Sequence, residues 1–259
     1  MKELVVLTGA SSGIGLEMAR ELATKGIDLI LVARRMDILQ NIKTELESLF
    51  RIKVTIISKD LSKPESAKEL YDEIKSQKLI VTGLINNAGF GNYGDFSETP
   101  LAEDLNMIQV NVATMVSLTK LFLIDMKAIS RGRIMNIASL LSFLPFPYYS
   151  VYSATKAFVL AFTETLAAEL EGSGVIVTAL CPGPIDTGFN TSEMLKTNAY
   201  KTNKPMDPKV VAKQGIELFL NGKGKKIVGF NNWFISNLPR ITPDRIMMKI
   251  KKNLASIKS

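Results

Sequence analysis

Short runs of apolar residues alternate along the chain with longer segments in which apolar residues recur every three or four positions. The short runs predict buried strands, and the longer segments predict helices with one apolar face. The predicted strands are 4–7, 29–33, 54–57, one ending at 84–86, 133–138, 175–180 and 226–229. The predicted helices are 16–24, 37–50, 103–127, 151–171 and 208–220. This alternation predicts an α/β fold, a doubly wound parallel sheet with helices on both faces in a single domain.

The composition is that of a chain with one large core. With 259 residues, 46% of them hydrophobic, the chain is long enough for a single α/β domain. Histidine is absent, which excludes a Ser-His-Asp hydrolase and any His-ligated metal site. The single cysteine, Cys181, precludes an intrachain disulfide and a multi-cysteine metal cluster. We therefore expect a reduced compartment and no bound metal.

Residues 134–155 carry no charge and are long enough to cross a membrane. Asn136, four serines, Pro145 and Pro147 interrupt this segment, so we expect a buried strand followed by a pocket loop. The apolar run at the N-terminus is short and lacks a small-residue cleavage site, so no signal peptide is predicted. These features predict a soluble cytoplasmic protein.

Tyr152 and Lys156 lie four residues apart in a predicted helix, a spacing that brings both side chains to one face. A free tyrosine has a pKa of about 10, too high for efficient proton transfer at neutral pH. An ammonium about 4 Å from the phenol oxygen favours the phenolate by roughly 4 kcal/mol, or about three pKa units. The pair therefore predicts an acid that works near neutral pH. A solvated helix surface is the alternative, since most Tyr-x3-Lys pairs have no catalytic role.

A glycine-rich turn, Thr8-Gly9-Ala10-Ser11-Ser12-Gly13-Ile14-Gly15, joins the first predicted strand to the first predicted helix. Such a turn lets the backbone approach a pyrophosphate and aims the N-terminal amides of the helix at it. The spacing is Gly-x3-Gly-x-Gly, which differs from the Gly-x-Gly-x-x-Gly fingerprint, and a tight turn without a ligand is the alternative. The predicted phosphate-binding residues are Gly9, Ser11, Ser12, Gly13, Ile14 and Gly15.

The end of the second predicted strand, Val32-Ala33-Arg34-Arg35, bears on the choice of cofactor. Enzymes that bind NAD place an acidic residue there to bond the ribose 2′-hydroxyl. Alanine stands at that position here, and the two guanidinium groups that follow can bind a 2′-phosphate. We therefore predict NADP(H) in preference to NAD(H). Two surface arginines that merely follow a strand are the alternative.

The order of these motifs resembles that of the short-chain dehydrogenase/reductase family, in its single-domain branch with a Rossmann-type fold. The shared motifs cover most of residues 4–190: Thr8-Gly9-x3-Gly13-Ile14-Gly15, Asp60-Leu61, Asn86-Asn87-Ala88-Gly89, Asn111, Ser139, Tyr152-x3-Lys156 and Pro182-Gly183. Within the family, the phrases around Asn87 and Pro182 look most like bacterial reductases of broad or unassigned substrate.

The resemblance implies roles for single residues. It implies that Asp60 and Leu61 lie beside the adenine, and that Asn87, Ala88 and Gly89 line the floor under the cofactor. It also implies that Pro182, Gly183, Ile185 and Thr187 hold the nicotinamide carboxamide. Asn111 would hold a water-linked proton path to Lys156, and a structural buried amide is the alternative. Ser139 follows the fifth predicted strand, where its hydroxyl can bond a substrate carbonyl together with Tyr152.

These residues predict an NADPH-dependent oxidoreductase that transfers a hydride between the nicotinamide and a ketone or aldehyde, or the corresponding alcohol. Tyr152 would protonate the oxygen, Lys156 would lower the tyrosine pKa and bond the nicotinamide ribose, and Ser139 would orient the carbonyl. A catalytically silent NADP(H)-binding sensor or scaffold is the alternative. The apolar segment 140–149, with Phe90, Tyr93 and residues 188–205, is expected to wall a pocket for an apolar carbonyl substrate.

Residues 1–238 are predicted to form the reductase domain, with a basic amphipathic helix appended in residues 239–259. From Lys223 to Ser259 there are nine Lys or Arg and one acid, so 9 − 1 = +8, whereas the whole chain is +7. One face of this helix is apolar and consists of Ile246, Met247, Ile250, Leu254 and Ile257. The helix is predicted to begin with Thr242 as its N-cap and Pro243 as its first residue. That face could lie on an anionic membrane, or pack on the protein itself, which we favour.

The helices at 103–127 and 151–171 are expected to pair between subunits, so that the protein forms a homodimer or homotetramer. No nucleic acid is expected to bind.

Overall fold

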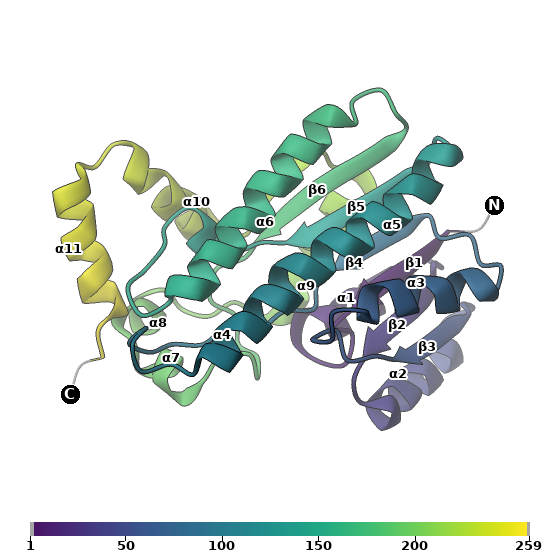
Figure 1. Ribbon diagram of the computed structural model, residues 1–259, viewed down its shortest axis with the longest axis horizontal. Coiled ribbons are helices and arrows are strands. Elements are labelled where there is room, and N and C mark those ends of the chain that lie inside the picture. Colours follow the sequence, from purple (N-terminus) through teal and green to yellow (C-terminus); the bar gives the residue numbers. More distant parts are fainter. Residues whose placement is uncertain (1–2, 258–259) are drawn as a thin grey trace.

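Seven strands form one sheet through the centre of the molecule, whose structure, a computed structural model, describes residues 3–257 (Figure 1). The strands are β1 Leu4–Thr8, β2 Asp28–Ala33, β3 Val54–Ser58, β4 Gly83–Asn86, β5 Gly132–Ile137, β6 Val175–Cys181 and β7 Gly224–Ile227. All neighbours pair in parallel, in the order β3-β2-β1-β4-β5-β6-β7. The order reverses between β1 and β4, and ligands of open α/β sheets bind beside such a reversal, at the carboxyl ends of the strands.

Helices cover both faces of this sheet, which explains why its central strands are continuous apolar runs. On one face lie α1 Gly13–Thr24, α2 Met36–Leu49 and α9 Pro208–Asn221, whose Met18, Leu46 and Phe219 join one apolar core. On the other lie α3 Ser66–Ser76, α5 Met115–Ala128 and α6 Ser150–Glu169, where Leu70 and Phe122 are buried in a second core. The predicted doubly wound fold is confirmed.

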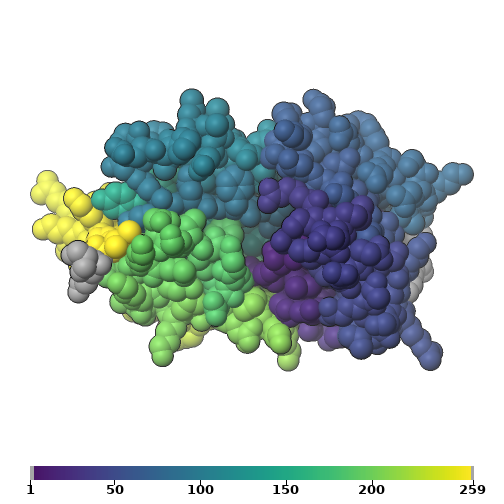
Figure 2. Space-filling view, turned by 90° about the horizontal axis from the view of Figure 1, so that it is seen from below, coloured from purple at the N-terminus to yellow at the C-terminus, as the bar shows by residue number. Residues whose placement is uncertain are grey.

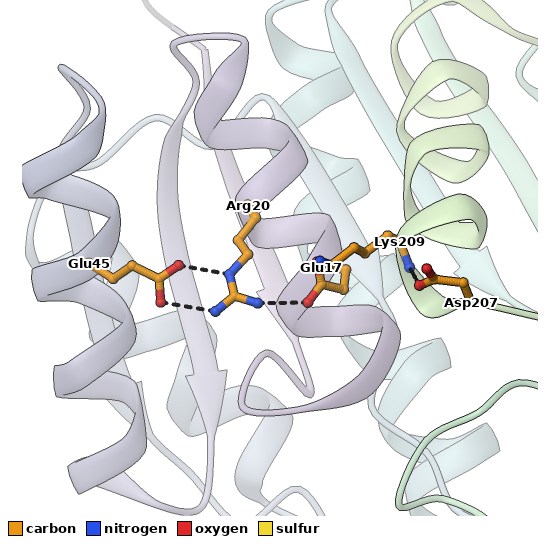
Figure 3. Close-up of polar contacts among 5 residues, drawn as sticks. All are labelled: Glu17, Arg20, Glu45, Asp207 and Lys209. Atoms are coloured by element: carbon orange, nitrogen blue, oxygen red, sulfur yellow. Dashed lines mark hydrogen bonds and ion pairs between the residues drawn. The ribbon is translucent and has the colours of Figure 1, made fainter.

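An ion pair links the first two helices, α1 and α2, on their face of the sheet (Figure 3). The guanidinium of Arg20 on α1 donates from Nε and Nη2 to the two carboxylate oxygens of Glu45 on α2, at 2.7 and 3.0 Å. Its Nη1 donates to Glu17 at 2.7 Å. The hydrogen bond from Arg20 holds the pKa of Glu45 below its ordinary value. Figure 3 also shows Asp207 at the start of α9, where its carboxylate accepts from the backbone N–H of Lys209 at 2.8 Å.

The long helix predicted over 103–127 contains a local change of winding. It consists of α4 Leu101–Ile108, the π-helical turn η1 Gln109–Thr114 and then α5. Residues 101–128 are long and apolar enough to cross a membrane by length and composition. In the most apolar stretch of this helix, 44% is buried inside the protein. A helix in the core of a folded domain can have the same length and composition, so these two properties are a weak indication of a membrane span.

Several elements differ from the sequence-based predictions. Helices α3, α7 Ser192–Lys196, α8 Asn198–Thr202 and α10 Phe230–Asn237 lie in segments for which no helix was predicted. Strand β7 lies two residues earlier than predicted. The C-terminal helix α11 spans Asp244–Ala255, so Pro243 is its N-cap rather than its first residue, and Ile257 lies beyond it. Short 3-10 turns, η2 Leu140–Ser142 and η3 Leu238–Arg240, occur in the pocket loop and before α11.

Candidate active site

A cavity of about 960 Å³ opens at the carboxyl ends of the strands. With the exception of Asn111, every residue predicted to bind a cofactor or to act in catalysis lines this cavity. These lining residues are Gly9, Ser11, Ser12, Gly13, Ile14, Gly15, Arg34, Arg35, Asp60, Leu61, Asn87, Ala88, Gly89, Ser139, Tyr152, Lys156, Pro182, Gly183, Ile185 and Thr187. The fold therefore brings together side chains from six separate strand ends, as expected at the carboxyl edge of a parallel sheet.

The glycine-rich turn between β1 and α1 is too tight for side chains at two of its positions. Gly9 has a φ of +66°, and a Cβ there would lie 2.8 Å from Nδ2 of Asn87. A Cβ on Gly15 would lie only 2.2 Å from the carbonyl oxygen of Gly9. The turn thus presents bare backbone to the cavity at the N-terminus of a 12-residue helix, an arrangement that suits a phosphate group.

The end of β4 is tied to this turn by hydrogen bonds. Oγ1 of Thr8 accepts from the backbone N–H groups of Asn87 and Ala88, both at 3.0 Å. The side-chain amide of Asn87 donates to the carbonyl oxygens of Thr8 and Gly9, at 3.0 and 3.1 Å. Asn87 therefore holds the shape of the turn as well as lining the floor of the cavity. This structural role of Thr8 was not predicted from the sequence.

Positive charge gathers where β2 and β3 end. Arg34 and Arg35 are exposed at the rim, and within residues 3–257 neither guanidinium pairs with a carboxylate. Lys59, which was not predicted, also lines the cavity, and its Nζ lies 3.3 Å from Glu69. Hydrogen bonds from Ser62 hold the pKa of Asp60 below its ordinary value, with a smaller contribution from the charge of Arg34. This rim can receive an additional anionic group.

Ser139, Tyr152 and Lys156 lie close together in the wall of the cavity. Ser139 follows β5, and its Oγ accepts from the backbone N–H of Leu141 at 3.1 Å, which caps η2. Tyr152 and Lys156 project from successive turns of α6. Nζ of Lys156 donates to the carbonyl oxygen of Ile137 at 2.8 Å and lies 5.9 Å from the centre of the Tyr152 ring. The predicted sharing of one helix face by the tyrosine and the lysine is therefore observed.

Burial governs the proton affinities of this pair. It raises the pKa of Tyr152 to about 12, against the opposing effect of a hydrogen bond with Ser139. It also lowers the pKa of Lys156 to about 8. The sequence-based prediction that Lys156 lowers the tyrosine pKa is thus not met in the protein alone, because Nζ is bound to Ile137 and desolvation dominates. At neutral pH the phenol carries its proton, and the amine is mostly charged.

Asn111 lies behind the cavity wall, in the π-helical turn η1, and is 2% exposed. Its Oδ1 accepts from the backbone N–H of Phe90 at 3.1 Å, and its Nδ2 donates to the carbonyl oxygen of Phe90 at 2.9 Å. Nδ2 also donates to Oγ1 of Thr155 at 3.1 Å. A Cβ on Gly89 would lie 2.8 Å from Oδ1 of Asn111 and 3.5 Å from Nζ of Lys156. Gly89 therefore lies close to both the Asn111 amide and the Lys156 ammonium, and because glycine has no side chain, both groups can approach its backbone.

The segment after β6 closes the cavity over the glycine-rich turn. A Cβ on Gly13 would lie 3.4 Å from the methyl group of Thr187, so the two segments nearly touch. Ile185 pairs with Met206 in an isolated parallel bridge, and Gly183 packs closely against Asn232. The thiol of Cys181 is buried beside this segment, and burial raises its pKa to about 12, so it is an inert core residue.

The remaining wall of the cavity is mainly apolar. Among its residues are Phe90, Leu140, Leu141, Leu144, Phe146, Tyr149, Phe189, Met194, Ile235, Leu238, Met247, Ile250 and Leu254. Phe90, the loop 140–149 and residues 188–205 were predicted to contribute, whereas α10, η3 and α11 were not. Figure 2 shows α11 (yellow) at one end of the molecule, beside the green segment that carries α7 and α8. Met247, Ile250 and Leu254 of the predicted apolar face of α11 thus pack on the protein itself, as favoured from the sequence, whereas Ile246 is 53% exposed.

Tyr93 does not line the cavity, contrary to the prediction. Its hydroxyl donates to the carbonyl oxygen of Ala255 at 2.8 Å, at the end of α11. Its ring packs against Tyr148 and Tyr149, with centroid distances of 5.4 and 5.1 Å. Tyr93 therefore holds α11 in place from behind the wall.

Comparison with known proteins gives consistent matches over most of the chain. The family model described as short chain dehydrogenase matches residues 3–198. Human 17-beta-hydroxysteroid dehydrogenase type 3 is 35% identical over 206 residues, which are 76% of this chain and 65% of that protein. Human very-long-chain 3-oxoacyl-CoA reductase is 31% identical over 260 residues, 97% of this chain and 80% of that protein. The matched region thus spans just under two thirds of the former relative.

A solved structure extends the comparison to the fold. A short-chain dehydrogenase from Sphingobium yanoikuyae, in complex with NADPH, superposes with a TM-score of 0.79 at 26% identity. The superposition covers 92% of this chain and 93% of that one.

Proposed function

This chain belongs to the short-chain dehydrogenase/reductase family, and from this we propose that it is an NADPH-dependent reductase of apolar ketones and aldehydes. One observation carries the proposal: Ser139, Tyr152 and Lys156 lie close together in one cavity that is lined by both the glycine-rich turn and a group of apolar side chains. A carbonyl group held at that point is within reach of both hydroxyl groups. We propose roles for the predicted site residues on the same basis.

The backbone cradle fits a dinucleotide. The turn at Gly9 and Gly15 has no room for side chains, so a pyrophosphate can approach the N–H groups at the start of α1. Arg34 and Arg35 stand at the adenosine end without carboxylate partners in the described part of the chain, and can bind a 2′-phosphate. We propose that Asp60 and Leu61 flank the adenine, and that residues 182–187 hold the carboxamide. When bound, the nicotinamide supplies the hydride that reduces the carbonyl carbon.

The protein's own residues supply the proton and the charge balance. The hydroxyl of Tyr152 is protonated at neutral pH and would donate its proton to the carbonyl oxygen, while Ser139 donates a second hydrogen bond. The negative charge left on the phenol is then stabilised by the ammonium of Lys156. Asn111 would act as a positioning residue, because it fixes the Phe90 segment beside the cavity.

The walls support a substrate with a large apolar body. Leu140, Leu144, Phe189 and Met247 face the cavity, and the loop between Ser139 and Tyr152 contains no Lys or Arg that could bind a carboxylate. The names of two relatives specify a hydroxysteroid and a very-long-chain 3-oxoacyl-CoA, whose oxygen functions lie on a steroid skeleton and on a long acyl chain, both of which are apolar. We therefore propose bulky apolar carbonyl compounds rather than small charged oxo acids.

The assignment of the acid is tested by following NADPH absorbance with a panel of ketones and aldehydes. Tyr152→Phe should lower kcat by roughly 10²- to 10⁴-fold, because it removes the proton donor. Tyr148→Phe is the matched control, since Tyr148 lies four residues before Tyr152, in the loop ahead of α6, and does not line the cavity. Activity that survives Tyr152→Phe would falsify this assignment, and a preference for small charged oxo acids would refute the substrate class.

The choice of cofactor is tested by Arg34→Ala. Loss of a charge-assisted hydrogen bond to the 2′-phosphate should raise KM for NADPH roughly 10- to 100-fold and leave KM for NADH nearly unchanged. Arg51→Ala is the control, because Arg51 is an exposed arginine outside the cavity. Equal effects of Arg34→Ala on the two cofactors would contradict the proposed phosphate contact.

A further inference from the structure

Between Phe230 and Met248, from α10 through η3 to α11, the chain exposes large apolar side chains, which together we call the C-terminal surface. Its members and their exposed fractions are Phe230 78%, Trp233 52%, Phe234 55%, Ile241 79%, Ile246 53% and Met248 58%. Phe230, Trp233 and Phe234 share one face of α10 by their spacing, and the rings of the first two stack at 5.9 Å. Clustered aromatic side chains at this exposure are unusual for a surface that faces only water.

Within residues 3–257, these exposed side chains do not contribute to the apolar core of the fold. The opposite sides of the same helices are buried: Asn232 and Ser236 of α10 are 3% and 4% exposed, and Met247 of α11 is 3% exposed. Ile235 and Leu238 also face inward and line the cavity. Figure 1 shows α10 and α11 at the end of the molecule remote from the N-terminus, with α11 at the periphery. Among residues 3–257, the C-terminal surface therefore lies outside the core that holds these helices.

The surroundings of the C-terminal surface are strongly basic. Residues 223–259 contain nine Lys or Arg and one acid, a net charge of +8, while residues 1–222 sum to −1. Arg245, Lys249 and Lys252 are exposed and share one side of α11 by their spacing of four and three residues. The basic charge of the protein is thus concentrated in the segment of the chain that carries these aromatic side chains.

We propose that the C-terminal surface docks this protein on an anionic lipid membrane. Trp and Phe side chains favour the boundary between headgroups and acyl chains, and Lys or Arg residues beside them are attracted to anionic lipids. A second copy of the chain would bring a net charge of +8 against an identical +8, which opposes pairing through this surface. Because the inner sides of α10 and α11 wall the cavity, docking would bring the cavity next to the lipid.

Trp233 gives a direct test, because it is the only tryptophan of the chain and belongs to the C-terminal surface. The full-length protein is mixed with vesicles of phosphatidylglycerol and phosphatidylcholine, and with vesicles of phosphatidylcholine alone. With the anionic vesicles, the emission of Trp233 should shift to shorter wavelength, and the protein should co-sediment. Neutral vesicles should bind at least tenfold more weakly, and added salt should weaken the anionic binding.

Two pairs of substitutions separate the apolar and electrostatic contributions. Phe230→Ser with Phe234→Ser should weaken vesicle binding roughly tenfold or more, because two aromatic anchors are lost. Lys249→Glu with Lys252→Glu should weaken it roughly 25-fold or more, at about fivefold per basic residue. The controls are Leu49→Ser with Ile129→Ser, which remove exposed apolar residues elsewhere, and Lys43→Glu with Lys127→Glu, which make the same change of charge. Neither control should alter binding.

Vesicle binding that is absent, or equal in the variants and their controls, would overturn the proposal. So would a change in sedimentation coefficient caused by the Phe230 and Phe234 substitutions without an effect on vesicles, since that result identifies a subunit interface. The binding measurement requires no turnover, so it is independent of the proposed reductase activity. Reduction of a water-soluble ketone by each variant, at an unchanged rate, shows that the variant is folded.

Discussion

Burial moves the proton affinities of two neighbouring side chains in opposite directions at the centre of the site. The pKa of Tyr152 rises to about 12 and that of Lys156 falls to about 8, because a buried position disfavours both the phenolate and the ammonium. Tyr152 therefore carries its proton, and can donate it, over the whole physiological pH range. The charge of Lys156, in contrast, depends on pH close to that range.

We expect kcat/KM for carbonyl reduction to fall above about pH 8. The ammonium of Lys156 stabilises the phenolate that proton transfer creates, and this ammonium is lost as the pH rises through the pKa of about 8. The slope above the pKa should approach tenfold per pH unit, since kcat/KM reports the groups of the free enzyme. The measurement is the pH profile of kcat/KM with a water-soluble ketone from pH 6 to 10.

Lys156→Arg provides the comparison for that profile. Arginine keeps its charge throughout the pH range, so the descending limb should disappear even if the overall rate is lower. A wild-type profile that stays flat to pH 9.5 would show that the charge of Lys156 does not control the step.

At the scale of elements, the π-helical turn η1 determines where Asn111 points. A π-helical turn adds a residue to the helix and interrupts its regular hydrogen bonding, and such turns are frequent at functional sites. Here it places the Asn111 amide within reach of both backbone polar groups of Phe90 and of Thr155 on α6. One side chain thereby connects the long helix, the segment after β4 and the helix that carries Tyr152.

Asn111→Leu should lower the free energy of unfolding by about 2–4 kcal/mol, because the N–H and C=O groups of Phe90 lose their partners. Because Phe90 lines the cavity, kcat should fall as well. Gln109→Leu in the same turn is the control: it removes one partly buried hydrogen bond to Thr114 and should cost less than about 1.5 kcal/mol. Urea unfolding followed by circular dichroism measures the free energy of unfolding of both variants. An equal decrease in the two variants would contradict a special role for Asn111.

The elements that could be predicted from sequence are those with a clear pattern of their own. The apolar run of β1 and the spacing of Ile38, Ile42 and Leu46 in α2 indicate their structures locally. Helix α3 has such a pattern too, because its buried Ala67, Leu70 and Ile74 recur at helical spacing, and it could therefore have been predicted. Helix α10 has aromatic residues on its exposed side and Asn232 and Ser236 on its buried side, the reverse of the usual pattern.

The candidate site divides in the same way. The glycine turn and the Tyr152–Lys156 pair could be identified because their chemistry depends on short spacings in the sequence, whereas Ser139 was predicted from its place after a strand and from the family resemblance. The contributions of Ile235, Met247 and Leu254 to the cavity depend on how remote helices pack, and no local pattern specifies it. The pKa of Tyr152 could not be predicted either, because desolvation is a property of the folded surroundings.

At the scale of the whole molecule, one layer of helices leaves apolar side chains uncovered. Helices α4 and α6 pack against each other and run along the same face of the sheet (Figure 1). Leu105 and Ile108 of α4 are 56% and 42% exposed, and Phe158 of α6 is 44% exposed and stacks on Phe162. We propose that this layer is the contact between subunits of a homodimer or homotetramer, as expected from the sequence.

Leu105→Glu with Phe158→Glu should convert the assembly into monomers, because each new charge would have to be buried without a partner. Sedimentation velocity at micromolar concentration should show a dimer or tetramer for the unmodified protein and a monomer for this variant. Leu49→Glu, which places a charge at a comparably exposed apolar position on α2, should leave the assembly intact. An unmodified protein that sediments only as a monomer would contradict the proposal.

The hydrogen bond between Tyr93 and Ala255 spans 162 positions in the chain, and this has a consequence for biosynthesis. A ribosome that adds about 5–20 residues per second reaches Ala255 roughly 8–30 s after Tyr93. During that interval Tyr152 and Lys156 are added after the glycine turn and Arg34, whereas α11 (Asp244–Ala255) is completed only at its end. The residues that we propose hold the nucleotide are therefore synthesised before α11, which walls the other part of the cavity, so the nucleotide half of the site is made first during translation and the last part of the substrate wall at the end.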